Sequence, residues 1–315
     1  MLQVLVSRKI SVADGICSFE LQAPDGSALP PFTAGAHIDV HTPAGVTRQY
    51  SLCNHPEERH RYLIGVLKDP QSRGGSQAMH EQLEQGQTLT IGEPRNLFPL
   101  AADGKKHLLF AGGIGITPML AMAYELSQRG VDFELHYSFR ASANAAFLDV
   151  LSNAPFASQI ALYDNAASAK LDAPAVLAQP EAGVHLYVCG PSGFMDHVLS
   201  TAAAQGWPAE QTHREFFSAA PVEHDGDQPF EVELAKSGQV FHIPADRSVF
   251  EVLDEAGIEI ETSCEQGICG SCVTRVLQGT PDHRDQFMTD KEHALNDRFT
   301  PCCSRAKTPR LLLDL

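Results

Sequence analysis

Three cysteines in the last quarter of the chain have the spacing of an iron–sulfur ligand loop. They stand at Cys264, Cys269 and Cys272, a C-x4-C-x2-C pattern, and a fourth thiol is available at Cys302 or Cys303. This is the spacing of a plant-type [2Fe–2S] centre, in which two bridged irons take four thiolates. Zinc also binds four thiolates, but zinc ribbons usually carry two C-x2-C pairs. The pattern therefore favours an iron–sulfur cluster over structural zinc.

The segment between these cysteines contains glycine where a tight loop needs it. Gly267 and Gly270 can adopt positive φ angles and let the backbone approach a bound group closely. Backbone N–H groups of such a loop can point at sulfur atoms, which helps to set the reduction potential of a cluster. We therefore expect residues 262–274 to curl around the cluster.

A second motif, GGIGITP at residues 112–118, follows an apolar run that predicts a buried strand. An apolar-periodic segment after it predicts a helix through residue 126. A glycine turn between a strand and a helix can place dinucleotide phosphates at the helix N-terminus. The run departs from G-x-G-x-x-G because Pro118 occupies the last position. We expect Thr117 to be the N-cap and Pro118 the first helical residue, which would also suit a turn of purely structural importance.

Cys189-Gly190-Pro191 forms a similar turn after a predicted strand at residues 185–189. The carboxyl ends of parallel strands share one edge of a sheet, so this turn should face the same crevice as residues 112–118. Cys189 could equally be a small buried hydrophobic residue.

Two segments in the first third of the chain could bind a phosphorylated heterocycle. RQYS at residues 48–51 offers the fixed charge of Arg48 for a phosphate and the ring of Tyr50 for a flat heterocycle. SRGGS at residues 72–76 opens a predicted helix and offers N–H groups and hydroxyls. Each motif alone is also common in ordinary strands and turns.

The elements that must position these motifs fall into three groups. Short strands between Pro/Gly turns predict an antiparallel β-barrel in the first third; they are expected at residues 3–7, 16–21, 37–42, 48–52, 62–67 and 88–92, with a helix at 76–83. Strands at 107–111, 133–139 and 185–189 alternate with helices and predict a parallel α/β sheet. Strands at 230–234 and 239–243, then a helix at 248–256 with Ser248 as N-cap, suit a ferredoxin-like β-grasp.

Composition shifts give the predicted domain boundaries. Residues 1–103 form the barrel, 104–220 the α/β domain and 229–315 the cluster domain. The stretch before residue 229 is small, acidic and rich in turn formers, so residues 221–228 are predicted to be a linker.

Charge and hydropathy exclude several classes of partner. The 315 residues carry a net charge of −16, which argues against binding nucleic acid or an anionic membrane. The most apolar stretch, residues 108–123, is too short to span a bilayer and contains several glycines. The first ten residues lack the apolar region of a signal peptide, and the cysteines outside the cluster pattern suggest free thiols. We expect a cytoplasmic protein.

Four segments together resemble a known family. RQYSLCN at residues 48–54, SRGGS at 72–76, EPRNLFPL at 93–100 and CCSRAKTPRLLLDL at 302–315 are similar to the phthalate dioxygenase reductase family. Within it, they look most like the reductase components of vanillate-type O-demethylases. The resemblance runs the full length of the chain. It implies a flavin barrel, a ferredoxin-reductase-like nucleotide domain and a C-terminal plant-type ferredoxin domain.

The resemblance also implies the residues that bind each cofactor. No adenosine-binding extension is evident after the barrel motifs, which favours FMN over FAD. The residues implied for FMN are Arg48, Tyr50, Ser51, Gly65, Val66, Leu67, Gly74, Gly75 and Ser76. Those implied for NADH are Gly113, Thr117, Pro118, Arg140, Cys189, Gly190 and Pro191, with the ring of Phe217 near the flavin.

Two of these assignments have alternatives. Arg140 follows the second strand of the α/β domain and could bind the 2′-phosphate of NADPH, but the resemblance points to NADH. The family's last cluster cysteine stands immediately before the residue that precedes Ser-Arg-Ala, which implies Cys302. Cys303 then occupies a position that is usually apolar, and this is the main ambiguity in the ligand set.

The order of the predicted parts defines the expected reaction. NADH releases two electrons as a hydride, whereas an iron–sulfur cluster takes one at a time, so a flavin must lie between them. We expect electrons to pass from NADH to FMN, to the cluster and then to a separate Rieske-type terminal oxygenase. No acid–base residue is needed, and Ser51 and Cys189 would position the flavin N5 and the nicotinamide. We expect a monomer.

Three alternatives remain at this point. The chain could be a ferredoxin-like carrier or redox sensor that does not turn over NADH. It could be a self-sufficient oxygenase, although its histidines form no H-E-x-x-H motif and no Cys-His Rieske pair. It could also be a zinc protein, which metal analysis would decide.

Overall fold

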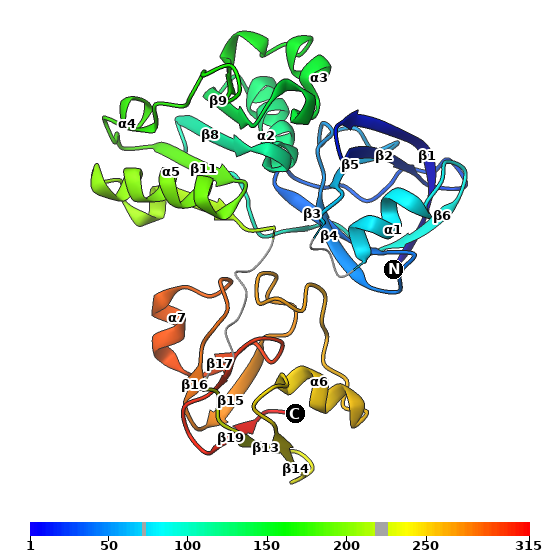
Figure 1. Ribbon diagram of the computed structural model, residues 1–315, viewed down its shortest axis with the longest axis vertical. Helices are drawn as coiled ribbons and strands as arrows, with labels where there is room; N and C mark the ends of the chain where they lie inside the picture. Colours follow the sequence, from blue (N-terminus) through cyan, green and yellow to red (C-terminus); the bar gives the residue numbers. More distant parts are fainter. Residues whose placement is uncertain (71–73, 218–225) are drawn as a thin grey trace. The chain divides into compact units, whose positions relative to one another are not determined.

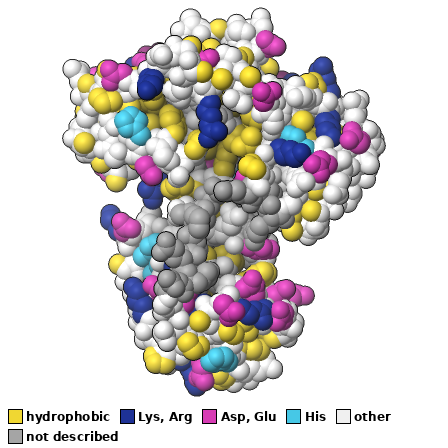
Figure 2. All heavy atoms as spheres, in the orientation of Figure 1, with side chains coloured by type: hydrophobic (Ala, Val, Ile, Leu, Met, Phe, Trp, Pro, Cys, Tyr) yellow, Lys and Arg dark blue, Asp and Glu magenta, His cyan; other side chains and the backbone are white. Residues whose placement is uncertain are grey.

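The computed structural model describes residues 1–70, 74–217 and 226–315. They form two compact units, one ending at Phe217 and the other reaching Leu315 (Figure 1). No helix among the described residues is long and apolar enough to cross a membrane. On the face shown in Figure 2, acidic and basic side chains are interspersed on both units.

The first unit begins with an antiparallel sheet in the order β4-β3-β6-β1-β2-β5, with β7 paired to β3. Its strands are β1 (Leu2–Ala13), β2 (Ile16–Gln22), β3 (Ala36–His41), β4 (Thr47–Ser51), β5 (Tyr62–Leu67), β6 (Thr88–Ile91) and β7 (Arg95–Asn96). Alternate residues of β1 and β3, among them Val4, Val6 and Ile38, are fully buried and form one core. Helix α1 (Gly75–Glu81) adds Met79 to this core. The strands predicted for the first third are therefore confirmed.

The second half of this unit is a five-stranded parallel sheet in the order β10-β9-β8-β11-β12. Its strands are β8 (Lys106–Gly112), β9 (Asp132–Phe139), β10 (Ile160–Asp164), β11 (Val184–Cys189) and β12 (Thr212–Glu215). The helices are α2 (Ile116–Arg129), α3 (Leu148–Ser152), α4 (Ala173–Val176) and α5 (Ser192–Ala204), with short 3-10 turns η1 (Gly113–Gly115), η2 (Ser142–Asn144), η3 (Ala157–Gln159) and η4 (Ala209–Gln211). The alternation confirms the predicted α/β class.

Helix α2 joins the two sheets of this unit. Its buried face includes Ile116, Met119 and Met122, which pack in a cluster with Phe98 of the N-terminal segment and Tyr137 of the parallel sheet. A separate cluster under α4 and α5 covers the other side of β8 and β11. A shared apolar core explains why the barrel and the nucleotide sheet form one compact unit.

The second unit is built on a sheet in the order β14-β13-β19-β15-β17, beside a small β16–β18 pair. Its strands are β13 (Phe230–Leu234), β14 (Val240–Ile243), β15 (Thr274–Gln278), β16 (Pro281–Asp282), β17 (Arg298–Phe299), β18 (Arg305–Ala306) and β19 (Arg310–Leu313), and its helices are α6 (Val249–Glu255) and α7 (Asp290–Leu295). The predicted hairpin is confirmed by the β13–β14 pairing. Ser248 caps α6 in a capping box with Glu251, which confirms that prediction too.

The start of the second unit lies inside the predicted linker. Residues 221–225 of that linker lie outside the described part of the chain. Asp227, however, forms ion pairs with Arg284 and with Arg305, the latter at 3.4 Å. Because its carboxylate is nearly buried between two guanidinium groups, Asp227 belongs to the folded unit rather than to a free connection.

Candidate functional site: a dinucleotide crevice, a flavin edge and a four-thiol loop

The four predicted cluster ligands are arranged as two pairs. The Sγ atoms of Cys272 and Cys302 lie 3.3 Å apart, and the thiols of Cys264 and Cys269 are hydrogen-bond partners. Within the described ranges, no three cysteine sulfurs gather within 4.8 Å of one another, as one tetrahedral zinc ion would require. A [2Fe–2S] centre takes two thiolates on each iron. The donor set therefore fits two bridged irons better than a single zinc.

The loop that carries three of these thiols has the glycine geometry predicted for it. Gly267 and Gly270 have φ angles of 73° and 70°. A Cβ on Gly267 would lie 2.4 Å from the Cys303 sulfur, and one on Gly270 would lie 2.3 Å from the Phe287 ring. The backbone N–H of Gln266 points at the Cys264 sulfur at 3.3 Å, and that of Ser271 at the Cys269 sulfur at 3.5 Å. N–H groups directed at the thiols are what a cluster loop needs.

The thiol of Cys303 has different neighbours from the thiol of Cys302. Its sulfur lies 3.2 Å from the Thr300 hydroxyl and 3.9 Å from the Ser304 hydroxyl, and it is nearly buried against Gly267. The Cys303 thiol also contacts that of Cys302. The Cys302 sulfur lies at hydrogen-bond distance from that of Cys272. The geometry thus favours Cys302 as the fourth ligand and gives Cys303 a packing role behind the loop.

The two predicted nucleotide turns lie against each other at the centre of the parallel sheet. Ala111 of β8 and Cys189 of β11 are in register, so residues 112–118 and 189–191 leave adjacent strands at the same edge. From β8 the sheet continues to β9 on one side, whereas β11 and β12 lie on the other. The crossovers therefore diverge between β8 and β11, and such a switch point creates a crevice for a ligand outside the strand ends.

Glycine is required where these turns touch. A Cβ on Gly115 would lie 2.2 Å from the Cys189 carbonyl oxygen, and a Cβ on Gly190 would lie 2.9 Å from the Gly112 Cα. Both obstacles are backbone atoms, which cannot move aside as a side chain can. Gly113, with a φ angle of 54°, is open to space and turns the chain into α2. The glycines thus set the width of the crevice.

The predicted start of α2 is wrong by two residues. The helix begins at Ile116 with Gly115 as its N-cap, and a 3-10 turn precedes it. Thr117 therefore lies inside the first turn, where its hydroxyl donates to the Ile114 carbonyl at 3.1 Å. Pro118 is the third helical residue, which is still a position whose N–H has no partner within the helix. The glycine turn, not a side-chain cap, starts this helix.

The barrel contributes an edge strand to the same region. β5 is the terminal strand of its sheet, paired with β2 on one side. A Cβ on Gly65 would lie 2.9 Å from the Thr117 methyl group and 3.2 Å from the Phe147 ring. Val66 is buried, whereas Leu67 is 40% exposed. Gly65 of the predicted flavin-binding segment thus lies beside the start of α2.

Arg48 lies at the start of α1. A Cβ on Gly75 would lie 2.9 Å from the Arg48 Cγ and 3.2 Å from its Nε. Gly74 precedes the helix with a φ angle of 94°, and the Ser76 hydroxyl accepts the Asp69 N–H at 3.2 Å. Ser72 and Arg73 of the same motif lie outside the described residues. Arg48 and the start of α1 therefore lie together, and Tyr50 is partly buried in β4.

A carboxyl group outside the predicted set of site residues lies at the centre of this region. The Ser51 hydroxyl donates to Glu215 Oε2 at 3.2 Å, and Glu215 is in register with Cys189 across β11 and β12. Burial raises the pKa of Glu215 to about 8, against a smaller lowering by Ser51. Burial, and then Glu215, raise the pKa of the Cys189 thiol. Glu215 keeps part of its surface accessible, so it borders the crevice rather than the core.

The pKa of Glu215 predicts how stability depends on pH. Between pH 4.5 and about 8 the folded chain binds one proton more than the unfolded chain at this group, because the folded pKa is raised. The contribution of Glu215 to the free energy of unfolding is fully present near pH 4.5. It is lost as the pH rises toward 8, by about 1.4 kcal/mol per pH unit.

Glu215→Gln should remove this slope. We expect urea unfolding from about pH 5 to about pH 8 to give a flatter stability profile for the variant than for the parent chain. The difference between the two profiles cancels the titration of histidines elsewhere. Parallel profiles would show that the Glu215 carboxyl is not protonated in the folded chain.

The two remaining predicted site residues, Arg140 and Phe217, lie at the rim of the crevice. Arg140 is exposed at the end of β9, and Phe217 is 38% exposed directly after β12. Sequence patterns could place both after a strand but could not show what they face. Glu215 was missed because its environment comes from Ser51 and Cys189, 164 and 26 positions away in the chain.

Comparisons with known proteins agree with this arrangement. Residues 232–307 match the profile described as a 2Fe-2S iron-sulfur cluster binding domain, and residues 94–212 match the N-terminal domain of the dimethylamine monooxygenase subunit DmmA-like family. The vanillate O-demethylase oxidoreductase of Pseudomonas putida is 59% identical over 317 residues, covering 100% of both chains.

Two solved structures extend the match over the whole chain. Phthalate dioxygenase reductase, described as a modular structure for electron transfer from pyridine nucleotides to [2Fe–2S], is 40% identical with a TM-score of 0.78, covering 100% of this chain and 98% of that one. An intact type IV self-sufficient cytochrome P450 monooxygenase is 39% identical with a TM-score of 0.88. It covers 100% of this chain, which spans only 41% of that larger protein.

A flavin-type barrel, a dinucleotide sheet and a four-thiol domain in one chain define an electron-transfer oxidoreductase with an iron–sulfur domain. The similarity over the full length then places this chain plainly: it belongs to the phthalate dioxygenase reductase family of oxygenase reductases. Membership in this family argues against the carrier or sensor that does not turn over a nucleotide.

Proposed function

We propose that this chain is the NADH-dependent reductase of a two-component O-demethylase or aromatic dioxygenase of the Rieske type. Its proposed cofactors are FMN and a [2Fe–2S] cluster. The observation that supports this most strongly is the meeting of β5, the start of α2 and Cys189 at one crevice, with a four-thiol loop elsewhere in the same chain. The proposed domains are residues 1–103, 104–220 and 229–315; of the predicted linker at 221–228, Asp227 is held by Arg284 and Arg305 of the last domain.

The proposed flavin site uses the barrel. Arg48 and the Gly74–Ser76 turn would bind the phosphate, because a guanidinium beside the N–H groups at a helix start suits a dianion. The Gly65–Leu67 segment of β5 and the ring of Tyr50 would hold the flat ring system. FMN supplies the ability to take two electrons together and release them singly.

The proposed nucleotide site uses the crevice at the switch point. Gly113, Thr117 and Pro118 at the start of α2, together with Gly190 and Pro191, would receive the pyrophosphate and nicotinamide of NADH. Arg140 would lie toward the adenosine end and Phe217 would border the flavin. Ser51 and Cys189 would orient the two reacting rings.

Glu215 adds a specific electrostatic function to this site. Its raised pKa keeps a proton on the carboxyl group at neutral pH. A neutral carboxyl places no negative charge where an electron pair is delivered, and it can exchange hydrogen bonds with the Ser51 hydroxyl. The chain's part in the reaction is therefore positioning and electrostatics rather than acid–base catalysis.

Anaerobic titration with NADH tests the proposal. We expect a yellow, iron-containing protein whose flavin and iron–sulfur absorbances are both bleached after about one and a half equivalents of NADH, since the two centres accept three electrons together. Bleaching of the flavin alone, or none, would contradict the proposed path. Chromatography of the released flavin separates FMN from FAD, and the same titration with NADPH tests the choice of nucleotide.

The oxygenase partner is proposed from relatives rather than from this chain. The P. putida relative is named as an oxidoreductase of vanillate O-demethylase, and we propose a separate terminal oxygenase of that kind as the electron acceptor. We further propose that the reductase is a cytoplasmic monomer. Light scattering tests the oligomeric state, and substrate-dependent NADH consumption by the reductase alone would support a self-sufficient oxygenase instead.

A further inference from the structure

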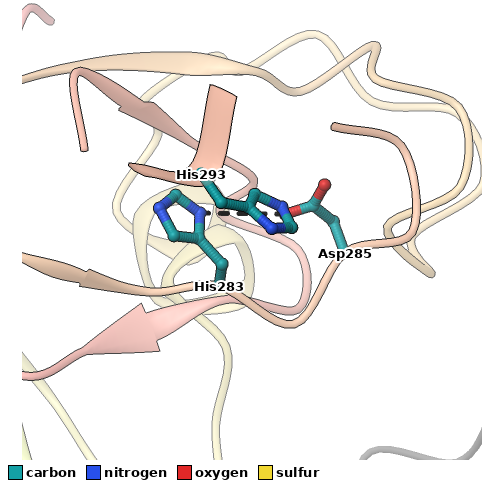
Figure 3. A group of neighbouring side chains, drawn as sticks. All are labelled: His283, Asp285 and His293. Carbon is teal, nitrogen blue, oxygen red and sulfur yellow. Dashed lines mark hydrogen bonds and ion pairs between the residues drawn. The ribbon is translucent and has the colours of Figure 1, made fainter. Parts of the chain in front are cut away.

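A group of three side chains in the second unit lies apart from the four thiols. The ligand atoms of His283, Asp285 and His293 all lie within 4.8 Å of one another. Figure 3 shows the two imidazole rings lying one over the other with the carboxylate at their edge. His283 and Asp285 lie in the loop that follows β16, and His293 is on α7. The loop and the helix thus converge on one point.

The carboxylate at this point is completely buried. Asp285 has no exposed side-chain surface. Its Oδ2 accepts the Met288 N–H at 2.8 Å, and its Oδ1 lies 3.1 Å from His293 Nε2 and 3.9 Å from His283 Nδ1. A buried carboxylate requires compensation by donors or cations, and one imidazole at hydrogen-bond distance supplies only part of it.

The second imidazole is the feature that the protein alone does not explain. The side chain of His283 is 92% buried, and neither of its ring nitrogens makes a well-formed hydrogen bond within the described part of the chain; the Asn296 side chain and the His293 backbone lie near the ring but give only weak contacts. Its ring stacks on that of His293 with centroids 4.3 Å apart and planes 19° apart. Buried polar atoms without partners are rare in folded proteins and usually mark an unseen water or ion.

We propose that His283, Asp285 and His293 form a binding site for a divalent transition metal ion, with Zn²⁺ as the reference ligand. Two imidazole nitrogens and one carboxylate oxygen suit borderline cations, and three protein ligands leave a position for water. The near-parallel rings must tilt to point their nitrogens at one ion. His293 can follow because α7 is short, its residues are partly or fully exposed, and its partner Asp285 is already within reach.

The site is distinct from the cluster ligands but lies directly behind their loop. The Gln286 N–H donates to the Gly267 carbonyl at 2.9 Å, and a Cβ on Gly267 would lie 3.1 Å from the Asp285 Cα. A metal here would tie β16, the loop at Asp285 and α7 together behind the cluster loop. Binding to the folded state alone would then stabilise the unit by mass action.

The test uses the full-length, untagged protein with its cluster intact. After treatment with EDTA and desalting, Zn²⁺ is titrated calorimetrically while iron content and visible absorbance are followed. We expect one saturable Zn²⁺ per chain, no loss of iron, and a higher unfolding temperature with Zn²⁺. Absence of saturable binding, or binding that proceeds only as iron is released, would overturn the site.

Matched variants locate the binding. His283→Gln and His293→Gln should each weaken Zn²⁺ binding at least about tenfold and remove the thermal shift. His242→Gln, which changes an exposed histidine of β14 in the same unit, should leave both unchanged. Asp285→Asn keeps an oxygen for the Met288 N–H and should also lose binding, which covers the case in which a histidine variant fails to fold. Equal affinity in all four variants would show that Zn²⁺ binds elsewhere.

Discussion

Cys302→Ser should give a protein that still contains flavin but has lost its iron–sulfur absorbance. The Sγ atoms of Cys302 and Cys272 lie 3.3 Å apart, so removing one thiol leaves one iron with a single protein ligand. We expect iron content to fall by more than about tenfold, since even residues outside the ligand sphere change metal affinity by that factor. NADH should still bleach the flavin, whereas reduction of cytochrome c through the cluster should be lost.

Cys303→Ser is the matched control for this change. The Cys303 sulfur is surrounded by the Thr300 and Ser304 hydroxyls and by Gly267, and a serine hydroxyl can replace it among such partners. We expect the cluster and its spectrum to be retained. If iron were lost from the Cys303 variant and kept in the Cys302 variant, the assignment of the fourth ligand would have to be reversed.

Gly115→Ala should disrupt the nucleotide crevice. The new Cβ would lie 2.2 Å from the Cys189 carbonyl oxygen and 2.8 Å from the Gly190 nitrogen. Both neighbours are backbone atoms of the adjacent turn, so the turns must separate. We expect a loss of stability of about 1–3 kcal/mol or more from overpacking, together with a large rise in the KM for NADH. Urea unfolding and steady-state kinetics measure the two effects.

Gly193→Ala gives the comparison for this glycine. Gly193 lies in the first turn of α5, near the same crevice, and a Cβ there meets nothing within 4 Å. Alanine is the better helix former, so stability should be unchanged or slightly higher. Equal KM values for the Gly115 and Gly193 variants would show that the close approach of the two turns does not shape the nucleotide site.

The features predicted best from the sequence are those in which a bound group requires particular residue types at a particular spacing. Cluster chemistry requires three thiols and two permissive glycines in one loop, and Gly267 and Gly270 have the positive φ angles expected of them. The glycine turns at residues 112–118 and 189–191 follow strands whose apolar runs are unambiguous, and the sheet brings them together. In both cases a short segment contains most of the information.

Features that depend on contacts between distant segments could not be predicted in this way. Thr117 has the residue type of an N-cap, but Gly115 takes that position two residues earlier, where the backbone is held against Cys189. Glu215 became part of the site only when Ser51 and Cys189 were found beside it. His283 and His293 lie ten positions apart and form no recognised motif, so only the fold reveals that they converge on Asp285.

The position of β19 has a consequence for how the protein is made. This strand is the last in chain order, yet it lies between β13 and β15, and Leu311 and Leu313 are completely buried in the core. During synthesis the sheet of the second unit cannot close until Leu313 has left the ribosome, whereas the first unit can fold beforehand. The iron–sulfur domain is therefore expected to assemble after the first unit, on a chain whose flavin and nucleotide parts are already folded.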